Sequence, residues 1–186
     1  TSISAYTNEN VFAAVRADLY TRTALPLNEF FEKYDQYTQE LRLTSPAEST
    51  ITYVAGLYYF YKKADNHFIR YIDINAIDLG PPGLAFSVVN DFKTDNESVA
   101  GFGQATWKVT DRSRIALGAR YNFDQLSLQQ TVAPIPGTIP EAPPGSIDAK
   151  TSDQAGSWRL IGEHDIAEGA IFYVSYAKGY KGPGSN

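Results

Sequence analysis

The sequence predicts an all-β fold: an antiparallel up-and-down sheet of about seven long strands, forming a sector of a transmembrane β-barrel with short periplasmic turns and long extracellular loops. Three observations predict it. Apolar and polar residues alternate over unusually long stretches, and short connections take turns with long ones. No stretch approaches the roughly 18 consecutive apolar residues of a transmembrane helix, which leaves the closed barrel as the other way to span a bilayer.

The clearest alternation lies at residues 115–124. One face is apolar and carries Ile115, Leu117, Ala119, Tyr121 and Phe123; the other carries Ala116, Gly118, Arg120, Asn122 and Asp124. Successive side chains of a strand point to opposite faces, so this segment has one apolar and one polar side. Further strands are predicted at residues 2–7, 37–45, 51–62, 98–109, 157–166 and 170–181.

The connections favour a membrane barrel over a soluble sandwich. Short links are predicted at residues 45–50, 110–113 and 166–169, and long loops at residues 9–34, 63–97 and 126–156. Short turns on one rim and long loops on the other are typical of outer-membrane barrels. A strand of about twelve residues reaches roughly 40 Å, and a tilt near 45° projects this length to about 28 Å, close to the hydrocarbon thickness of ~30 Å.

Aromatic residues are placed as interfacial girdles would be. Those near the predicted short turns are Tyr53, Trp107 and Phe172, and those nearer the long loops are Tyr58, Tyr59, Tyr61, Tyr121, Phe123, Tyr176 and Tyr180. The simpler interpretation is that aromatic residues favour strands in general.

Composition excludes several classes of protein. The 186 residues carry 16 Lys and Arg against 21 Asp and Glu, a formal net charge of -5, so we expect no nucleic acid as partner. The absence of Cys excludes a disulfide framework and a thiolate metal site. The sequence begins at Thr1 without a basic and apolar leader, so we expect a processed, trimmed or internal segment of a longer protein.

Several segments in succession resemble a known family. These are "QYTQELRLTSP", "YVAGLYYFYK", "ESVAGFGQATWKVTDRSRIALGARYNFDQ" and "SWRLIGEHDIAEGAIFYVSYAKGYKGPGSN". In this order they resemble the middle of the β-barrel of TonB-dependent outer-membrane receptors, the energised importers of Gram-negative bacteria. The resemblance covers nearly every predicted strand.

The resemblance implies uptake of a scarce nutrient, with a ferric siderophore as the favoured ligand, across the outer membrane of a Gram-negative bacterium. It implies a 22-stranded barrel with an N-terminal plug, so residues 1–186 would be a partial barrel domain, with the plug and the remaining strands outside it. The expected partners are outer-membrane lipid, those other parts of the receptor, TonB through a region outside this chain, and the imported ligand. The alternatives are a passive porin, an outer-membrane barrel enzyme such as a lipase, and a soluble β-rich carbohydrate-binding domain.

Ligand contact is expected in the extracellular mouth, from lumen-facing residues near the loops and from the loops themselves. The face that each residue occupies in the alternation, and its distance from the long loops, predict which residues contact the ligand. The candidates on the barrel wall are Tyr58, Lys62, Asn122 and Asp124, and those in a loop are Arg70 and Tyr71. Basic groups attract an anionic iron chelate, and tyrosines stack on it or form hydrogen bonds with it. Alternatively, these side chains form hydrogen bonds within the barrel wall or contact only water.

No other motif indicates chemistry, so we expect no catalysis, no cofactor and no metal site. His67 and His164 are far apart in sequence, and Asp65 with His67 is interpreted as part of a solvated loop. Glu163 and Asp165 are two positions apart, so they point to the same face of their predicted strand, and they suggest a lumen-facing hydrogen-bonded pair.

Three loop segments have local signals. Helical spacing of Val11, Val15 and Leu19 predicts a short helix within residues 10–20. The proline-dense segment 133–145 predicts extended polyproline backbone, interpreted as a mobile extracellular loop rather than a peptide-docking site. Residues 80–83 read Gly-Pro-Pro-Gly and predict a chain reversal.

Overall fold

The computed structural model describes residues 1–15, 17–19, 22–25, 27–74 and 83–182. Its strands are β1 (Ser2–Ala14), β2 (Ala17–Leu19), β3 (Arg22–Leu25), β4 (Leu27–Thr44), β5 (Ile51–Asp73), β6 (Ala85–Lys108), β7 (Ser113–Ala133), β8 (Ile139–Pro140), β9 (Gly145–Ala167) and β10 (Ala170–Lys178). The part of the chain that the structure describes has no helix long and apolar enough to cross a membrane.

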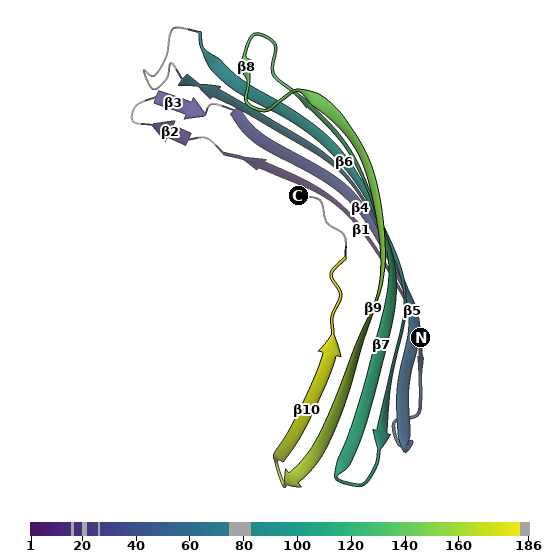
Figure 1. Cartoon of the computed structure of the whole chain (residues 1–186). Coiled ribbons are helices and arrows are strands. Elements are labelled where there is room, and N and C mark those ends of the chain that lie inside the picture. Colours follow the sequence, from purple (N-terminus) through teal and green to yellow (C-terminus); the bar gives the residue numbers. More distant parts are fainter. Residues whose placement is uncertain (16, 20–21, 26, 75–82, 183–186) are drawn as a thin grey trace.

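The long strands form one curved antiparallel sheet (Figure 1). Its order is β1-β4-β5-β6-β7-β9-β10, so consecutive long strands are neighbours, and the predicted up-and-down sheet is confirmed. The three short turns lie together at one end, and β2, β3 and β8 lie at the other (Figure 1). Among the described residues β1 and β10 each pair with one long strand, so the sheet is open.

The strands run much further than the sequence predicts. β5 has 23 residues and β6 has 24, so most of the segments predicted as long loops are paired strand. The alternation is lost there because both faces of the sheet meet water beyond the apolar band, and a strand with two polar faces has no period-2 signal. The predicted short turns are confirmed, and Gly169 makes the last one with a φ of 78°.

One local prediction was wrong. The segment predicted as a helix is strand β1 up to Ala14 and strand β2 from Ala17 to Leu19, with residues 16 and 20 outside the described part. Pairing with the edge of β4 overrides the helical spacing, because it satisfies the backbone groups on one side of β1 along its whole length. Residues 80–82 of the predicted reversal lie outside the described residues, and Gly83 has a φ of 84°.

Part of the proline-rich segment is folded back onto the sheet as strand β8. β8 pairs with β6 in parallel, with Phe86 opposite Ile139 and Ser87 opposite Pro140. This occurs where β6 extends beyond the end of β7, so β8 continues the sheet in its place. Ser87 is fully buried, and its hydroxyl accepts a hydrogen bond of 2.8 Å from the amide of Ile135.

The register decides which face each side chain occupies. It runs without a shift across β4, β5, β6 and β7, so the alternation of one strand continues in the next. One face carries large exposed apolar side chains, among them Leu41, Leu57, Val99, Trp107, Leu117 and Phe123. The other face contains the buried Ala100 and Asn122. Curvature crowds side chains on the concave side, so the apolar face is convex and the polar face is concave.

The apolar band ends at a row of aromatic residues on the convex face. Tyr37 and Tyr61 lie opposite each other in β4 and β5, with Tyr6 beyond Tyr37 in β1. About ten residues separate Ile51 from Tyr61, and a tilted strand of that length rises roughly 23 Å, close to the apolar height of about 25 Å in outer-membrane barrels. The structure therefore supports the interfacial girdle on this side.

A charge on the convex face is expected to destabilise the protein, whereas one on the concave face is not. Leu117 is 54% exposed on the convex face, so Leu117→Arg places a guanidinium in hydrocarbon. We expect a loss of about 2–4 kcal/mol in the free energy of unfolding, measured by urea unfolding of the intact protein in lipid vesicles. Thr106→Arg, on the concave face of the neighbouring strand, is the matched control, and an equal loss in both variants would contradict this assignment of the faces.

Gly56 is required by the close approach of two strands. A Cβ there would stand 2.4 Å from the carbonyl oxygen of Leu41 and 2.6 Å from Cζ of Phe102. We expect Gly56→Ala to lower the free energy of unfolding by about 1–3 kcal/mol, in the same assay. Gly103→Ala, whose Cβ would be 3.7 Å from its nearest neighbour, should be near neutral. Wild-type stability of the Gly56 variant would refute the packing described here.

Candidate ligand-binding wall

The concave face brings together most of the residues predicted to contact a ligand. Tyr58 lies opposite Ala100, and Ala100 lies opposite Asn122, so the three form one row across β5, β6 and β7. Asp124 is one row further toward the extracellular end, and Lys62 one row beyond Asp124. By register Tyr58, Lys62, Asn122 and Asp124 therefore share the concave face, as the alternation predicts, while contact with a ligand stays a prediction.

Arg120 links two of these residues. Its Nε donates a hydrogen bond of 2.7 Å to the side-chain oxygen of Asn122, and its guanidinium lies 5.3 Å from the centroid of the Tyr58 ring. Asn122 is 7% exposed, so this hydrogen bond satisfies a polar group that has little access to water. The sequence did not predict Arg120 as a ligand contact, although Arg120 is two positions from Asn122 and therefore lies on the same face of the strand.

A second cluster gathers around Asp124. Asp153 of β9 lies directly opposite Asp124, and the hydroxyl of Tyr180 donates hydrogen bonds to both carboxylates, at 2.9 Å to Asp124 and 3.3 Å to Asp153. Tyr180 lies beyond the end of β10, and desolvation together with these carboxylates raises the pKa of its hydroxyl above the usual value. The phenol therefore stays protonated and continues to separate the two negative charges.

Lys62 belongs to a third cluster. Its Nζ lies 3.4 Å from a carboxylate oxygen of Glu32 and 4.0 Å from the centroid of the Tyr34 ring. Tyr34 in turn donates a hydrogen bond to Glu9 of β1. Lys62 is therefore held by neighbours from β4, and a ligand anion would have to compete with Glu32 for it.

The two residues predicted in a loop are both in strand β5, and they face opposite sides. Arg70 lies on the concave side by register, and Tyr71 on the convex side. Arg70 forms an ion pair of 2.6 Å with Glu141, beside β8. Lys62 and Arg70 are eight positions apart on one strand, roughly 26 Å, so a single small ligand cannot contact Tyr58, Lys62 and Arg70 together.

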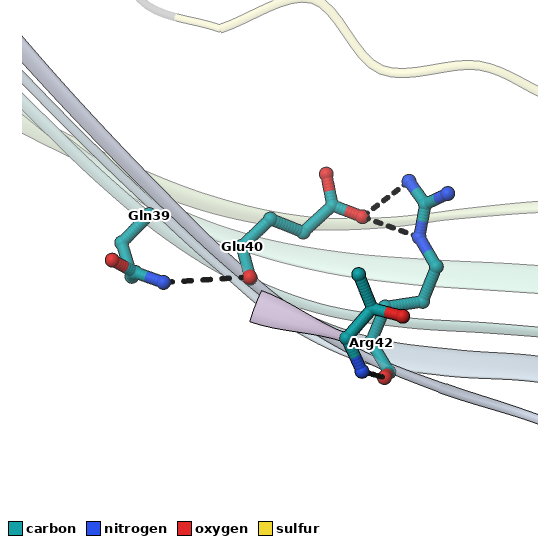
Figure 2. A network of polar contacts seen from close by, with 4 residues as sticks. Gln39, Glu40 and Arg42 are labelled. Atoms are coloured by element: carbon teal, nitrogen blue, oxygen red, sulfur yellow. Dashed lines mark hydrogen bonds and ion pairs between the residues drawn. The ribbon is translucent and has the colours of Figure 1, made fainter. Parts of the chain in front are cut away.

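A groove lined by basic groups runs along the concave wall toward the short turns. Its lining includes Arg42, Arg120 and Arg159, and its volume of about 590 Å³ is within the range of small-molecule sites. Figure 2 shows the guanidinium of Arg42 held by the carboxylate of Glu40 on the same strand, with Nε 2.8 Å from Oε1. Arg159 donates to the side-chain oxygen of Gln104 at 3.3 Å, so Arg120 and Arg159 have neutral hydrogen-bond partners among the described residues.

Several other ionisable residues hold neighbouring strands together. Glu163 and Asp165 share the concave face, as predicted, but each pairs with Arg114 of β7 rather than with the other. Asp65 and His67 are in strand β5 and not in a loop, and His67 Nδ1 lies 2.6 Å from the carboxylate of Asp91. Within the described ranges no group of His, Asp and Glu is arranged to hold a metal ion.

A curved antiparallel sheet with an apolar convex face, an aromatic border and a polar concave face defines a sector of a transmembrane β-barrel. The sequence profile of one family, described as "TonB dependent receptor-like, beta-barrel", matches residues 2–186. The chain therefore belongs to the TonB-dependent receptor β-barrel family, which confirms the predicted resemblance.

A solved structure has the same fold. The ferric yersiniabactin uptake receptor FyuA from Yersinia pestis superposes with a TM-score of 0.75 at 19% sequence identity. The match covers 94% of this chain and 24% of FyuA, so the chain spans about a quarter of the length of that receptor. No curated protein sequence matches the chain as a relative.

The folded-back segment depends on Ser87. Ser87→Ala removes the acceptor of the Ile135 amide and the hydroxyl that pairs with Thr138, so the contact should weaken by about 1–3 kcal/mol. We expect faster amide hydrogen exchange at residues 135–141 in the intact protein, measured by mass spectrometry. Ser127→Ala, at a half-buried position of β7, should leave this exchange unchanged. Unchanged protection in the Ser87 variant would mean that other contacts hold β8.

Proposed function

We propose that this chain forms part of the wall of a receptor that imports a ferric siderophore across the outer membrane of a Gram-negative bacterium, driven through TonB. Membership of the receptor family supports this proposal most directly. Residues 1–186 are then a partial barrel domain, and the plug, the remaining strands and the TonB-contacting region belong to other parts of the receptor. Those strands cover the open edges at β1 and β10.

The charges of the concave wall favour an anionic ligand. Arg120 and Arg159 have neutral partners and lie beside one groove, so their positive charge is available to a carboxylate or catecholate group of an iron chelate. Tyr58 adds an aromatic face next to Arg120. The similarity to FyuA agrees with this ligand class, since the name of that protein specifies uptake of a ferric siderophore.

Two alternatives to TonB-dependent import are a passive pore, which uses the same barrel, and an outer-membrane enzyme. A pore conducts without an energy source, whereas TonB-dependent uptake requires TonB and the proton gradient of the inner membrane. Radiolabelled ferric siderophore uptake in cells with and without TonB separates the two directly. The wall carries no recognisable catalytic constellation among its described residues, which supports transport rather than catalysis.

The site assignment is tested by replacing the wall candidates together. In the complete receptor, we expect the combined replacement Tyr58→Ala, Lys62→Gln, Asn122→Ala and Asp124→Asn to weaken binding of the ferric siderophore at least about tenfold, because stacking on Tyr58, the charge-assisted contact of Lys62 and the hydrogen bonds of Asn122 are lost. Isothermal titration calorimetry measures the Kd, with Lys108→Gln at the short-turn rim as control. Unchanged affinity would remove these residues from the site and leave the import proposal intact.

A further inference from the structure

An ion pair at the end of the wall opposite the short turns joins two distant parts of the chain. Arg70 lies near the end of β5 on the concave face, and its Nη1 is 2.6 Å from a carboxylate oxygen of Glu141. Glu141 directly follows β8 and ends the folded-back segment, residues 135–141, here called the strap. Arg70 is a predicted ligand contact, so Glu141 occupies a guanidinium that an anionic ligand would need.

The strap has several contacts with β6 besides this ion pair. The backbone amide of Glu141 donates a hydrogen bond of 2.9 Å to the carbonyl oxygen of Ser87. The amide of Ile135 donates to the hydroxyl of Ser87 at 2.8 Å, and the hydroxyl of Thr138 shares a hydrogen bond of 2.5 Å with the same group. Exchange of the partner of Arg70 therefore leaves the strap attached to the sheet.

The local sequence of the strap restricts its backbone. Residues 135–138 read Ile-Pro-Gly-Thr, Gly137 has a φ of 87°, and the amide of Thr138 donates to the carbonyl of Ile135 at 3.2 Å. These features are those of a type II β-turn, which favours Pro at its second position and Gly at its third. Pro140 precedes Glu141, and its ring fixes its own φ. Because the strap is restricted before any contact forms, it holds the Glu141 carboxylate next to Arg70 at a small loss of conformational entropy.

The surroundings of Arg70 suit a ligand with an anionic group and an aromatic or apolar body. Its guanidinium lies 5.0 Å from the centroid of the Phe68 ring, and Phe30 lies opposite Phe68 in β4, on the same concave face. The side chain of Arg70 is 36% exposed and that of Glu141 is 29% exposed, so a solute can reach the ion pair. An ion pair with this access to water is weak, and another anion can replace its acid.

We propose that Glu141 is an autoinhibitory carboxylate, which occupies Arg70 until the anionic group of an iron chelate displaces it. The proposal rests on the import function proposed above. Displacement exchanges one ion pair of Arg70 for another and releases the side chain of Glu141, while Ser87 continues to hold the strap. A neutral chelate gains no ion pair with Arg70 and leaves Glu141 in place, so the contact also selects ligands by charge.

Glu141→Gln tests the proposal, because it removes the competing charge and keeps the size of the side chain. In the complete receptor, we expect this variant to bind the anionic iron(III) complex of 2,3-dihydroxybenzoate about threefold more tightly than the wild type, since a larger fraction of Arg70 is free. Binding of the neutral iron(III) tris(acetohydroxamate) complex should not change. Isothermal titration calorimetry measures the Kd of each complex. Glu168→Gln removes the same charge at the short turn between β9 and β10 and is the matched control.

A chemical measurement follows Arg70 in the absence of ligand. The reagent p-hydroxyphenylglyoxal modifies free guanidinium groups, and peptide mass spectrometry reports the rate at each arginine. We expect Arg70 to be modified about threefold faster in Glu141→Gln than in the wild type, because its competing acid is gone. The rate at Arg112, in the short turn between β6 and β7, should be the same in both proteins. The anionic complex should slow modification of Arg70 in the variant, and the neutral complex should not.

Three results would each overturn the proposal. They are equal modification rates of Arg70 in the wild type and in Glu141→Gln, an unchanged Kd of the anionic complex in this variant, and a failure of that complex to protect Arg70. The import function is tested separately, by uptake of the iron complex in cells with and without TonB. Uptake that does not need TonB, alongside the expected results at Arg70, would count against the import function only.

Discussion

The structure depends on hydrogen bonding between neighbouring strands. In hydrocarbon no water is available to a backbone amide or carbonyl, so every such group of a spanning strand must pair with the next strand. The register of β4, β5, β6 and β7 runs without a shift over their common length, and it meets this requirement in the described part of the sheet. The open edges of β1 and β10 leave one row of backbone groups each to be paired by further strands.

The same register creates the candidate site. A slip by one residue would exchange the two faces, placing Tyr58 and Asn122 toward lipid and Leu57 and Tyr121 toward the lumen. Because the register holds, residues more than 60 positions apart in the sequence meet on the concave wall, as Arg120 does with Tyr58. The wall is therefore a product of strand pairing, with β5 contributing Tyr58 and Lys62 and β7 contributing Arg120, Asn122 and Asp124.

The strands continue past the membrane, and this gives the outer half of the sheet its character. Beyond Tyr61 both faces carry many polar residues, and cross-strand pairs such as His67 with Asp91 join neighbouring strands. The folded-back β8 closes this region by pairing with β6 and by placing Glu141 against Arg70. This outer half also buries small apolar side chains, among them Ala64, Ala85 and Val88.

The sequence by itself determined the class of fold, the short turns and the membrane-spanning part of each strand, because alternation is a local property imposed by lipid on one face and a polar lumen on the other. It also placed Tyr58, Lys62, Asn122 and Asp124 on the lumen side by parity. It missed the outer half of β5 and β6, where water on both faces removes the alternation, and it misread residues 10–20, where an edge pairing overrides helical spacing. Only the tertiary structure decided that Arg120 joins Tyr58 to Asn122. It also decided that Arg70 is held by Glu141 and that Tyr71 faces away from the concave wall. These contacts depend on cross-strand register and on the path of a returning loop, which no single segment encodes.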